Sequence, residues 1–103
     1  MTADLVWLAQ AETDLQSIFE YISIENASAA KLYVEAILSA CDRLRDFPLS
    51  GRRFDNRYRV LVVRNHLVMY RHQRTDGEVI VAAIVDGRRD IAALLRTLTD
   101  EQA

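Results

Sequence analysis

The fold is decided by residues 58–85, YRVLVVRNHLVMYRHQRTDGEVIVAAIV. This stretch contains three apolar runs rich in the branched and aromatic residues that strands favour: 58–63, 67–72 and 79–85. Residues 64–66 and 75–77 separate the runs, and both have the length and composition of hairpin turns. Because strands joined by tight turns pair side by side in opposite directions, the stretch predicts a three-stranded antiparallel meander.

Upstream of the meander, the apolar spacing changes from strand to helix. Residues 5–8 form a short β-prone run, and residues 9–23 then repeat apolar side chains every three or four positions. A second such stripe runs from Ser28, a suitable N-cap, to about Phe47, where Pro48 stops it. The two stripes predict a helical hairpin that covers one face of the sheet.

The end of the chain returns to helical spacing. Asp86-Gly87 ends the last strand, Asp90 can cap a helix, and apolar residues recur at helical spacing from Ile91 to Leu98. The whole pattern predicts an α+β fold: an N-terminal strand and a helical hairpin packed on a small antiparallel sheet, with a short C-terminal helix. At 103 residues the chain is expected to form a single domain over residues 1–103.

Composition excludes several broad classes of protein. Half of the residues are apolar, with only three glycines and one proline, so an intrinsically disordered chain is not expected. The sequence has no apolar run of the roughly 18–20 residues that span a bilayer, and its start lacks the features of a signal peptide. The lone Cys41 excludes an internal disulfide. A cytoplasmic location with no membrane partner is therefore expected.

Charge is distributed unevenly along the chain. In residues 1–50, three cations against eight carboxylates give −5, whereas in residues 51–103 ten arginines against seven carboxylates give +3. Every cation of the second half is thus an arginine, the side chain best suited to bidentate contacts with carboxylates and phosphates. This asymmetry indicates a binding face, although a solvated surface that favours arginine explains it as well.

The sequence offers little for catalytic chemistry. The glycines are scattered rather than gathered in a phosphate-binding loop, and His66 and His72 have no partner at metal-ligand spacing. Cys41 falls on an apolar helical stripe, which is typical of a core thiol and not of a nucleophile. Neither a metal nor a cofactor is therefore expected.

Arginine is what remains as a functional candidate. Arg88 and Arg89 leave the end of the last strand, while Arg59, Arg71 and the neighbouring Tyr70 lie on the preceding strands. If these side chains gather on or around the sheet face that the helical hairpin leaves open, they could bind a polyanion or an acidic protein. Arginines that only solvate a wet sheet face remain the alternative.

Five motifs in register carry a family resemblance over nearly the whole chain. They are A-x-x-D-L-x-x-I-x-x-Y-I at residues 11–22, AAKLYVEAI at 29–37, FPLSGRR at 47–53, YRVLVV followed by LVMYR at 58–71, and IVDGRRDIAALL at 84–95. With these motifs the sequence resembles the ParE branch of the RelE/ParE toxins of bacterial type II toxin–antitoxin systems. The resemblance implies a helical hairpin against a small antiparallel sheet.

The two branches of this family differ in activity. RelE-type toxins cleave mRNA on the ribosome with basic side chains and a tyrosine near the C-terminus. Arg88 falls where one of those arginines stands, but Leu67 occupies the position of another, and Leu94 lies near that of the tyrosine. ParE-type toxins, which inhibit DNA gyrase and trap cleaved DNA, also lack these groups. The resemblance thus implies a gyrase inhibitor that is not an enzyme. The alternatives are a ribosome-dependent mRNA endoribonuclease and a non-toxic module that binds antitoxin.

The resemblance also implies partners and contact residues. It implies no catalytic residue and no cofactor, but a hetero-oligomeric complex with a cognate ParD-like antitoxin, and DNA gyrase or the gyrase–DNA complex as the target. The residues expected to contact target or antitoxin are Arg88, Arg89, Arg59, Arg71 and Tyr70. The family usually has a histidine before the paired arginines, at the position of Asp86 in this chain.

Overall fold

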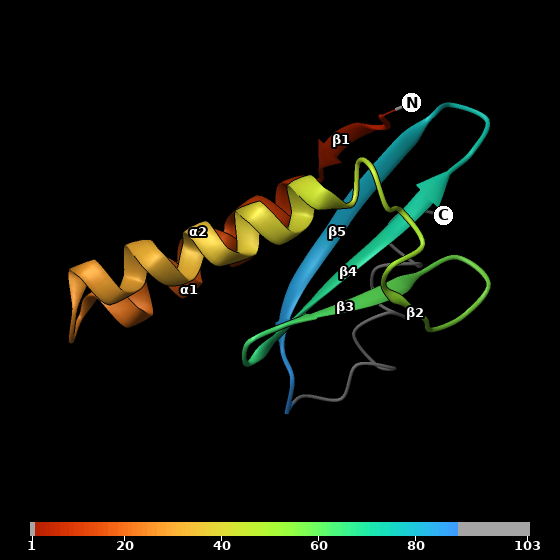
Figure 1. Ribbon diagram of the computed structural model, residues 1–103. Coiled ribbons are helices and arrows are strands. Elements are labelled where there is room, and N and C mark those ends of the chain that lie inside the picture. Colours follow the sequence, from red (N-terminus) through yellow and green to blue (C-terminus); the bar gives the residue numbers. More distant parts are fainter. Residues whose placement is uncertain (1, 89–103) are drawn as a thin grey trace.

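A computed structural model describes residues 2–88 and shows two helices against one face of a five-stranded sheet (Figure 1). The elements are β1 (Asp4–Trp7), α1 (Ala9–Ser23), α2 (Ala27–Arg43), β2 (Arg52–Arg53), β3 (Arg59–Val63), β4 (His66–Gln73) and β5 (Glu78–Asp86). The helical hairpin extends past the sheet on one side (Figure 1). The helix expected after Asp90 lies outside the described residues. No helix within residues 2–88 is long and apolar enough to cross a membrane.

The predicted meander is confirmed, and the structure adds a strand on each side of it. β3 pairs antiparallel with β4, and β4 with β5, while the strand order of the sheet is β1-β5-β4-β3-β2. β1 runs parallel to β5, with Asp4 opposite Glu78 and Trp7 opposite Val81. β2 is two residues long and pairs antiparallel with β3. The sheet is therefore mixed.

Helix α1 has its predicted bounds, but α2 differs from prediction at both ends. Its N-cap is Asn26 and not Ser28, because the extended Asn26 turns its Oδ1 to accept a hydrogen bond from the N–H of Ala29 at 3.0 Å. The helix ends at Arg43, four residues before the predicted Phe47. Beyond Arg43 the backbone forms turns in which an N–H bonds to the carbonyl three residues earlier. One such hydrogen bond joins the N–H of Arg45 to the carbonyl of Asp42 at 3.1 Å.

Both faces of the sheet carry apolar side chains. The cluster between helices and sheet contains Ala11, Ile37, Ala40, Cys41, Val63, Val68, Val81 and Ile84. A second buried cluster contains Tyr58, Val60, Met69, Ala82, Ala83 and Val85, with Leu8 and Leu67 against it. Since Met69 is opposite Ala83, and β-strand side chains alternate, this second cluster lies on the face that the helices leave open. The described side chains of that face are largely apolar, and the predicted gathering of arginines on it is not seen within residues 2–88.

Asp14 joins α1 to β5 through a bond that the strand pattern explains. β1 ends at Trp7, opposite Val81, so the N–H of Ile84 has no strand beside it, and Oδ2 of Asp14 accepts its hydrogen bond at 2.9 Å. We expect Asp14→Ala to leave this buried N–H unpaired and to lower the free energy of unfolding by about 1–3 kcal/mol. Urea denaturation measures the change. Glu20→Ala, an exposed carboxylate of the same helix, is the control and should change stability by no more than about 0.5 kcal/mol. Equal losses would contradict this role.

Candidate functional site

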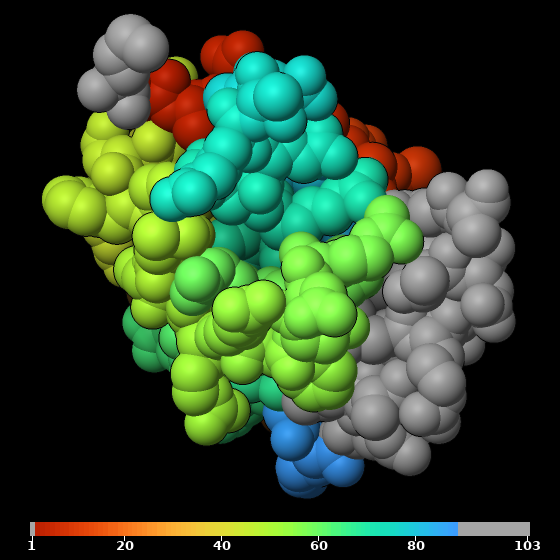
Figure 2. Space-filling view, turned by 90° about the vertical axis from the view of Figure 1, so that its right-hand side faces the viewer, coloured from red at the N-terminus to blue at the C-terminus, as the bar shows by residue number. Residues whose placement is uncertain are grey.

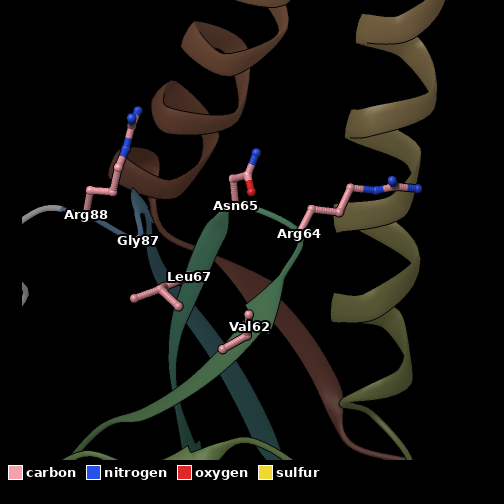
Figure 3. A pocket seen from close by; sticks show the side chains of 6 residues that line it. All are labelled: Val62, Arg64, Asn65, Leu67, Gly87 and Arg88. Atoms are coloured by element: carbon pink, nitrogen blue, oxygen red, sulfur yellow. The ribbon is translucent and has the colours of Figure 1, made fainter.

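A pocket of about 490 Å³ opens where the β3–β4 turn meets the end of β5 (Figure 3). Its lining residues are Val62, Arg64, Asn65, Leu67, Gly87 and Arg88. Val62 and Leu67 are opposite each other in the β3–β4 ladder, so their side chains lie together as an apolar floor. Val62 is 62% exposed, whereas the other residues of β3, β4 and β5 are buried or half-buried. The pocket thus combines an apolar floor with two cationic side chains at its rim.

The rim of the pocket is formed by the β3–β4 turn and the end of β5, whose backbones lie close together. Arg64 adopts φ 55°, the left-handed region that costs a residue with a side chain about 1–2 kcal/mol. The N–H of Gly87 donates to the carbonyl of Asn65 at 3.0 Å, which holds the end of β5 against the turn. A Cβ at Gly87 would lie 3.3 Å from that same carbonyl oxygen, so a residue without a side chain suits this approach. Strain held in place by neighbouring bonds is common at functional sites.

Arg88 is an exposed and oriented cation. Its side chain is 92% exposed, and its guanidinium forms an ion pair with Asp86 at 3.2 Å. The backbone N–H of Arg88 also donates to Oδ1 of Asp86 at 2.9 Å. In Figure 3 the side chains of Arg88 and Arg64 extend from opposite sides of the pocket, away from each other. They would therefore hold separate groups of a ligand, and not a single phosphate between them.

The ion pair makes a prediction about the ionisation of Asp86. The hydrogen bond from the Arg88 side chain, and then that from its backbone N–H, lower the pKa of Asp86 from 3.8 to about 2. Because the folded-state pKa is the lower one, the pair stabilises the fold above pH 4, and this contribution is lost as the pH falls towards 2. We expect Arg88→Ala to return the pKa of Asp86 towards 3.8 in an NMR titration of its carboxyl carbon. Arg64→Ala should leave it at about 2. A pKa that stays low in Arg88→Ala would contradict the pairing.

Tyr33 of α2 supports the turn from the helix side. The N–H of Asn65 donates to the Tyr33 hydroxyl at 3.2 Å, and that hydroxyl lies 2.5 Å from Nδ1 of His66. Which of the two groups donates in the Tyr33–His66 hydrogen bond depends on the tautomer of the imidazole. Burial lowers the pKa of His66, with smaller opposed effects of the charges on Asp86 and Arg88. The guanidinium of Arg64 sits 6.0 Å from the centre of the Tyr33 ring. His66 is therefore neutral at pH 7 and serves to position the turn.

Tyr70 and Arg59 lie away from the pocket and hold a loop. Tyr70 is completely buried, and its hydroxyl donates to the carbonyl of Pro48 at 2.8 Å and accepts from the N–H of Gly51 at 2.9 Å. Arg59 donates to the carbonyls of Gly51 and Leu49, at 2.8 and 3.3 Å. Both side chains thus bind the chain's own backbone between α2 and β3.

Arg71 is also separate from Arg88. It is half-buried and opposite Ile80, whereas the pocket lies at the other end of β4, where His66 is opposite Asp86. Five residues of strand correspond to roughly 16 Å. The structure therefore does not bring Arg59, Tyr70 or Arg71 together with Arg88, and Arg89 lies outside the described residues. The sequence interpretation missed Arg64, whose signal is its place in a two-residue hairpin turn.

The pocket offers cationic, amide and apolar side chains. Residues 2–88 contain no group of three side chains that could hold a metal ion. Cys41 is buried in the core, and burial raises its pKa to about 12, so its thiol stays protonated and shielded. The pocket itself offers two guanidinium groups, an amide and an apolar floor. These groups can hold an anionic and partly apolar partner surface.

The sequence and fold comparisons both identify toxins of toxin–antitoxin systems as similar proteins. A family model described as the ParE toxin of the type II toxin–antitoxin system, parDE, matches residues 5–91. The chromosomal ParDE system from P. aeruginosa is similar in fold, with a TM-score of 0.70 at 20% identity over 82% of this chain and 96% of that one. A search of curated proteins finds no match.

Two RelE-type structures are similar as well. The RelBE2 toxin–antitoxin complex from Mycobacterium tuberculosis has a TM-score of 0.65 at 13% identity, over 84% of this chain and 99% of that chain. A free double mutant of the E. coli toxin RelE has a TM-score of 0.69 at 10% identity, over 99% of this chain and 98% of that chain. At these identities the likeness establishes a shared fold.

Proposed function

The chain belongs to the ParE toxin family of type II toxin–antitoxin systems, and from this premise we propose that it inhibits DNA gyrase by binding and is neutralised by a cognate ParD-like antitoxin. The observation that carries the proposal is the apolar floor of the pocket. Leu67 stands where the resemblance to RelE-type toxins would require a basic side chain, and Val62 lies beside it. Removing a cation from a phosphate-cleaving site forfeits stabilisation of the charge that develops in the transition state.

The remaining pocket side chains support the same proposal. Arg88 is already paired with Asp86, and Arg64 extends away from it. His66, the nearest group with an ordinary pKa close to neutrality, has Nδ1 occupied by the Tyr33 hydroxyl. Among the described residues, no free group of the pocket is suited to take a proton from an attacking hydroxyl. Inhibition by contact requires none.

The second candidate function is ribosome-dependent mRNA cleavage of the RelE type. The fold likeness fits it equally well, since the TM-scores are 0.69 for RelE and 0.70 for the ParDE system. It would require arginines other than those of RelE to stabilise the phosphate charge. A non-toxic module that binds antitoxin is a third use of the same fold.

Two assays on the purified chain separate these functions. One measures gyrase supercoiling and the accumulation of cleaved DNA, and the other measures cleavage of mRNA on ribosomes. We expect inhibited supercoiling with trapped cleaved DNA and intact mRNA. Cut mRNA with unaffected gyrase would overturn the proposal in favour of the ribonuclease, and inactivity in both assays would favour the antitoxin-binding module.

An antitoxin partner is proposed because two of the similar solved structures are toxin–antitoxin systems. We expect the chain to form a hetero-oligomer with an antitoxin encoded beside it, and the proposed target places its action in the cytoplasm. Co-expression followed by native mass spectrometry gives the composition of the complex. Recovery of the chain alone from such a preparation would contradict this partner.

A further inference from the structure

The two edges of the sheet differ in character. The β2 edge is two residues long and carries exposed Arg52 and Arg53, whereas residues 5–8, along and just beyond β1, are all apolar. In Figure 2 the segment around β2 faces the viewer in yellow-green, and the red N-terminal residues appear only at the rim. Edge strands are commonly protected from pairing by charged side chains, proline or a bulge. β1 has a single charge, on Asp4 at its start, and its ladder with β5 is regular.

Two residues of β1 turn their backbone groups away from the sheet. The N–H of Asp4 donates to the carbonyl of Gly77 at 2.8 Å, on the side of β5. Because successive strand residues turn their backbone groups to alternate sides, those of Leu5 and Trp7 point outward. Within residues 2–88, the backbone hydrogen bonds outside the helices and ladders involve neither of these two residues. The edge therefore presents two donors and two acceptors to an added strand.

The start of this edge is covered by the chain itself. The N–H of Ala3, which points outward as those of Leu5 and Trp7 do, donates to the carbonyl of Arg45 at 2.9 Å. The side-chain Nε of Arg45 in turn donates to the carbonyl of Ala3 at 3.2 Å. The segment after α2 thus limits an added strand to Leu5 and Trp7, and it lies beside the place where that strand would end.

A second copy of β1 matches the open backbone groups. In an antiparallel pair with a twofold axis at Val6, Leu5 of each copy is opposite Trp7 of the other. Residues opposite each other in this way exchange both of their backbone hydrogen bonds, so every outward group is paired. The Leu5 side chain then packs against Trp7 of the second copy, and the two Val6 side chains meet on the other face. β1 is therefore complementary to itself in backbone and in side chains.

The charges beyond the paired residues also fit a second copy. Helix α1 begins directly after β1, and its N-cap Leu8 has no side-chain oxygen to accept from the first N–H groups of the helix. Glu12 is the acidic residue of its first turn. Antiparallel pairing brings this helix start beside the segment after α2 of the other copy, where Arg45 is followed by exposed Asp46. Asp46 then approaches the positive end of the helix, and Arg45 approaches Glu12.

We propose that β1 is a self-association edge, through which two copies of this chain pair in antiparallel fashion and join their sheets into one. The occupant is a second copy because one short apolar strand supplies both halves of the ladder, and because Arg45 and Asp46 lie where the helix of the other copy begins. The contact is short, so the dimer is weak and reversible, in the class of interfaces below about 1,200 Å². It uses neither β2 nor the pocket at Arg88, and it does not depend on gyrase being the target.

Sedimentation velocity of the purified full chain measures the association. We expect the weight-average sedimentation coefficient to rise from that of a monomer to that of a dimer over roughly 1–300 µM. Val6→Lys should shift this transition at least about 10-fold to higher concentration, because two lysines then face each other across the twofold axis. Val6→Glu should do the same. An equimolar mixture of the two variants should associate within about 3-fold of the unmodified chain, since each lysine then faces a glutamate.

Two matched controls show whether the effects belong to this edge. Val62→Lys makes the same change at an exposed strand residue away from β1 and should leave association within about 2-fold of the unmodified chain. Glu12→Arg should weaken association about 3-fold or more by repelling Arg45 of the second copy. Glu20→Arg, an exposed charge reversal farther along the same helix, should have no effect. Circular dichroism of each variant checks that the fold is kept.

Several results would overturn the proposal. One is a chain that stays monomeric at about 300 µM. Others are an equal weakening by Val62→Lys, and a mixture of the Val6 variants that associates no better than either variant alone. If the Val6 variants fail to fold, the two helix variants decide, because both change exposed side chains: equal association of Glu12→Arg and Glu20→Arg would exclude this contact.

Discussion

Replacing Arg88 and Arg89 with alanine is expected to weaken inhibition of gyrase supercoiling by at least about 100-fold, while the fold and antitoxin binding persist. The side chain of Arg88 is 92% exposed, and its hydrogen bonds within the described residues are with the neighbouring Asp86. Truncating one partner of a charge pair that is buried and hydrogen-bonded in an interface costs about 2–5 kcal/mol of binding free energy. The concentration of toxin that halves supercoiling measures the loss, and growth of expressing cells gives a second readout.

Two control variants separate contact from other causes. Asp86→Asn frees Arg88 from its ion pair without removing the cation, so it should inhibit at least as well as the unmodified chain. Arg74→Ala removes another exposed arginine, at the β4–β5 turn, and should have no effect. Full inhibition by the double alanine variant would exclude the paired arginines from the target contact. Loss of antitoxin binding instead would assign them to the neutralising interface.

Gly51→Ala is expected to lower the free energy of unfolding by about 2–4 kcal/mol. A Cβ at residue 51 would lie 2.6 Å from the Tyr70 hydroxyl oxygen and 2.7 Å from its Cε1, closer than such atoms approach. Tyr70 is fully buried and has little room to move, so the loop must shift. It then loses the hydrogen bond from the Gly51 N–H to the Tyr70 hydroxyl and the one from that hydroxyl to the Pro48 carbonyl. Urea denaturation gives the change.

Gly77→Ala is the matched control for the effect of removing a glycine. Gly77 has φ 64° but nothing within 4 Å of the added Cβ, so only backbone strain of about 1 kcal/mol is expected. Tyr70→Phe should cost about 1–3 kcal/mol by leaving the Gly51 N–H and the Pro48 carbonyl unpaired. Combined with Gly51→Ala, its effect should be less than additive, because both changes break the same contact. Additive losses would contradict the contact as the cause.

The elements of the fold could be predicted from local patterns alone. Helical spacing located α1 at its observed bounds, and the two hairpin turns located β3, β4 and β5 to within one residue at most ends. The end of α2 was predicted less well. Pro48 sets a limit that the helix cannot pass, but the helix ends earlier, at Arg43. The choice of Asn26 over Ser28 as N-cap depends on which residue adopts the extended backbone, which the sequence does not specify.

The pairing of β1 with β5 and the grouping of arginines could not be predicted in the same way. Periodicity predicts a strand at residues 5–8, one residue from the observed Asp4–Trp7, but its partner β5 lies far along the sequence. The alternation of side chains correctly separates Tyr70 from Arg71. It does not reveal that the open face is apolar, or that Arg59 turns to the loop backbone. Arg64 reaches the pocket because of a positive φ in a turn, which no apolar pattern records.

The parallel pairing of β1 with β5 has a consequence for synthesis on the ribosome. β1 is the first strand to emerge, yet its partner residues are 78–81, so the N-terminal strand and the helical hairpin wait for most of the chain. At a rate of about 5–20 residues per second, this wait lasts several seconds. An mRNA that is cut before the codon for residue 78 yields a product without β5, the strand that lies between β1 and β4. Incomplete translation should therefore give harmless chains, and the toxic form should arise only once β5 has been made.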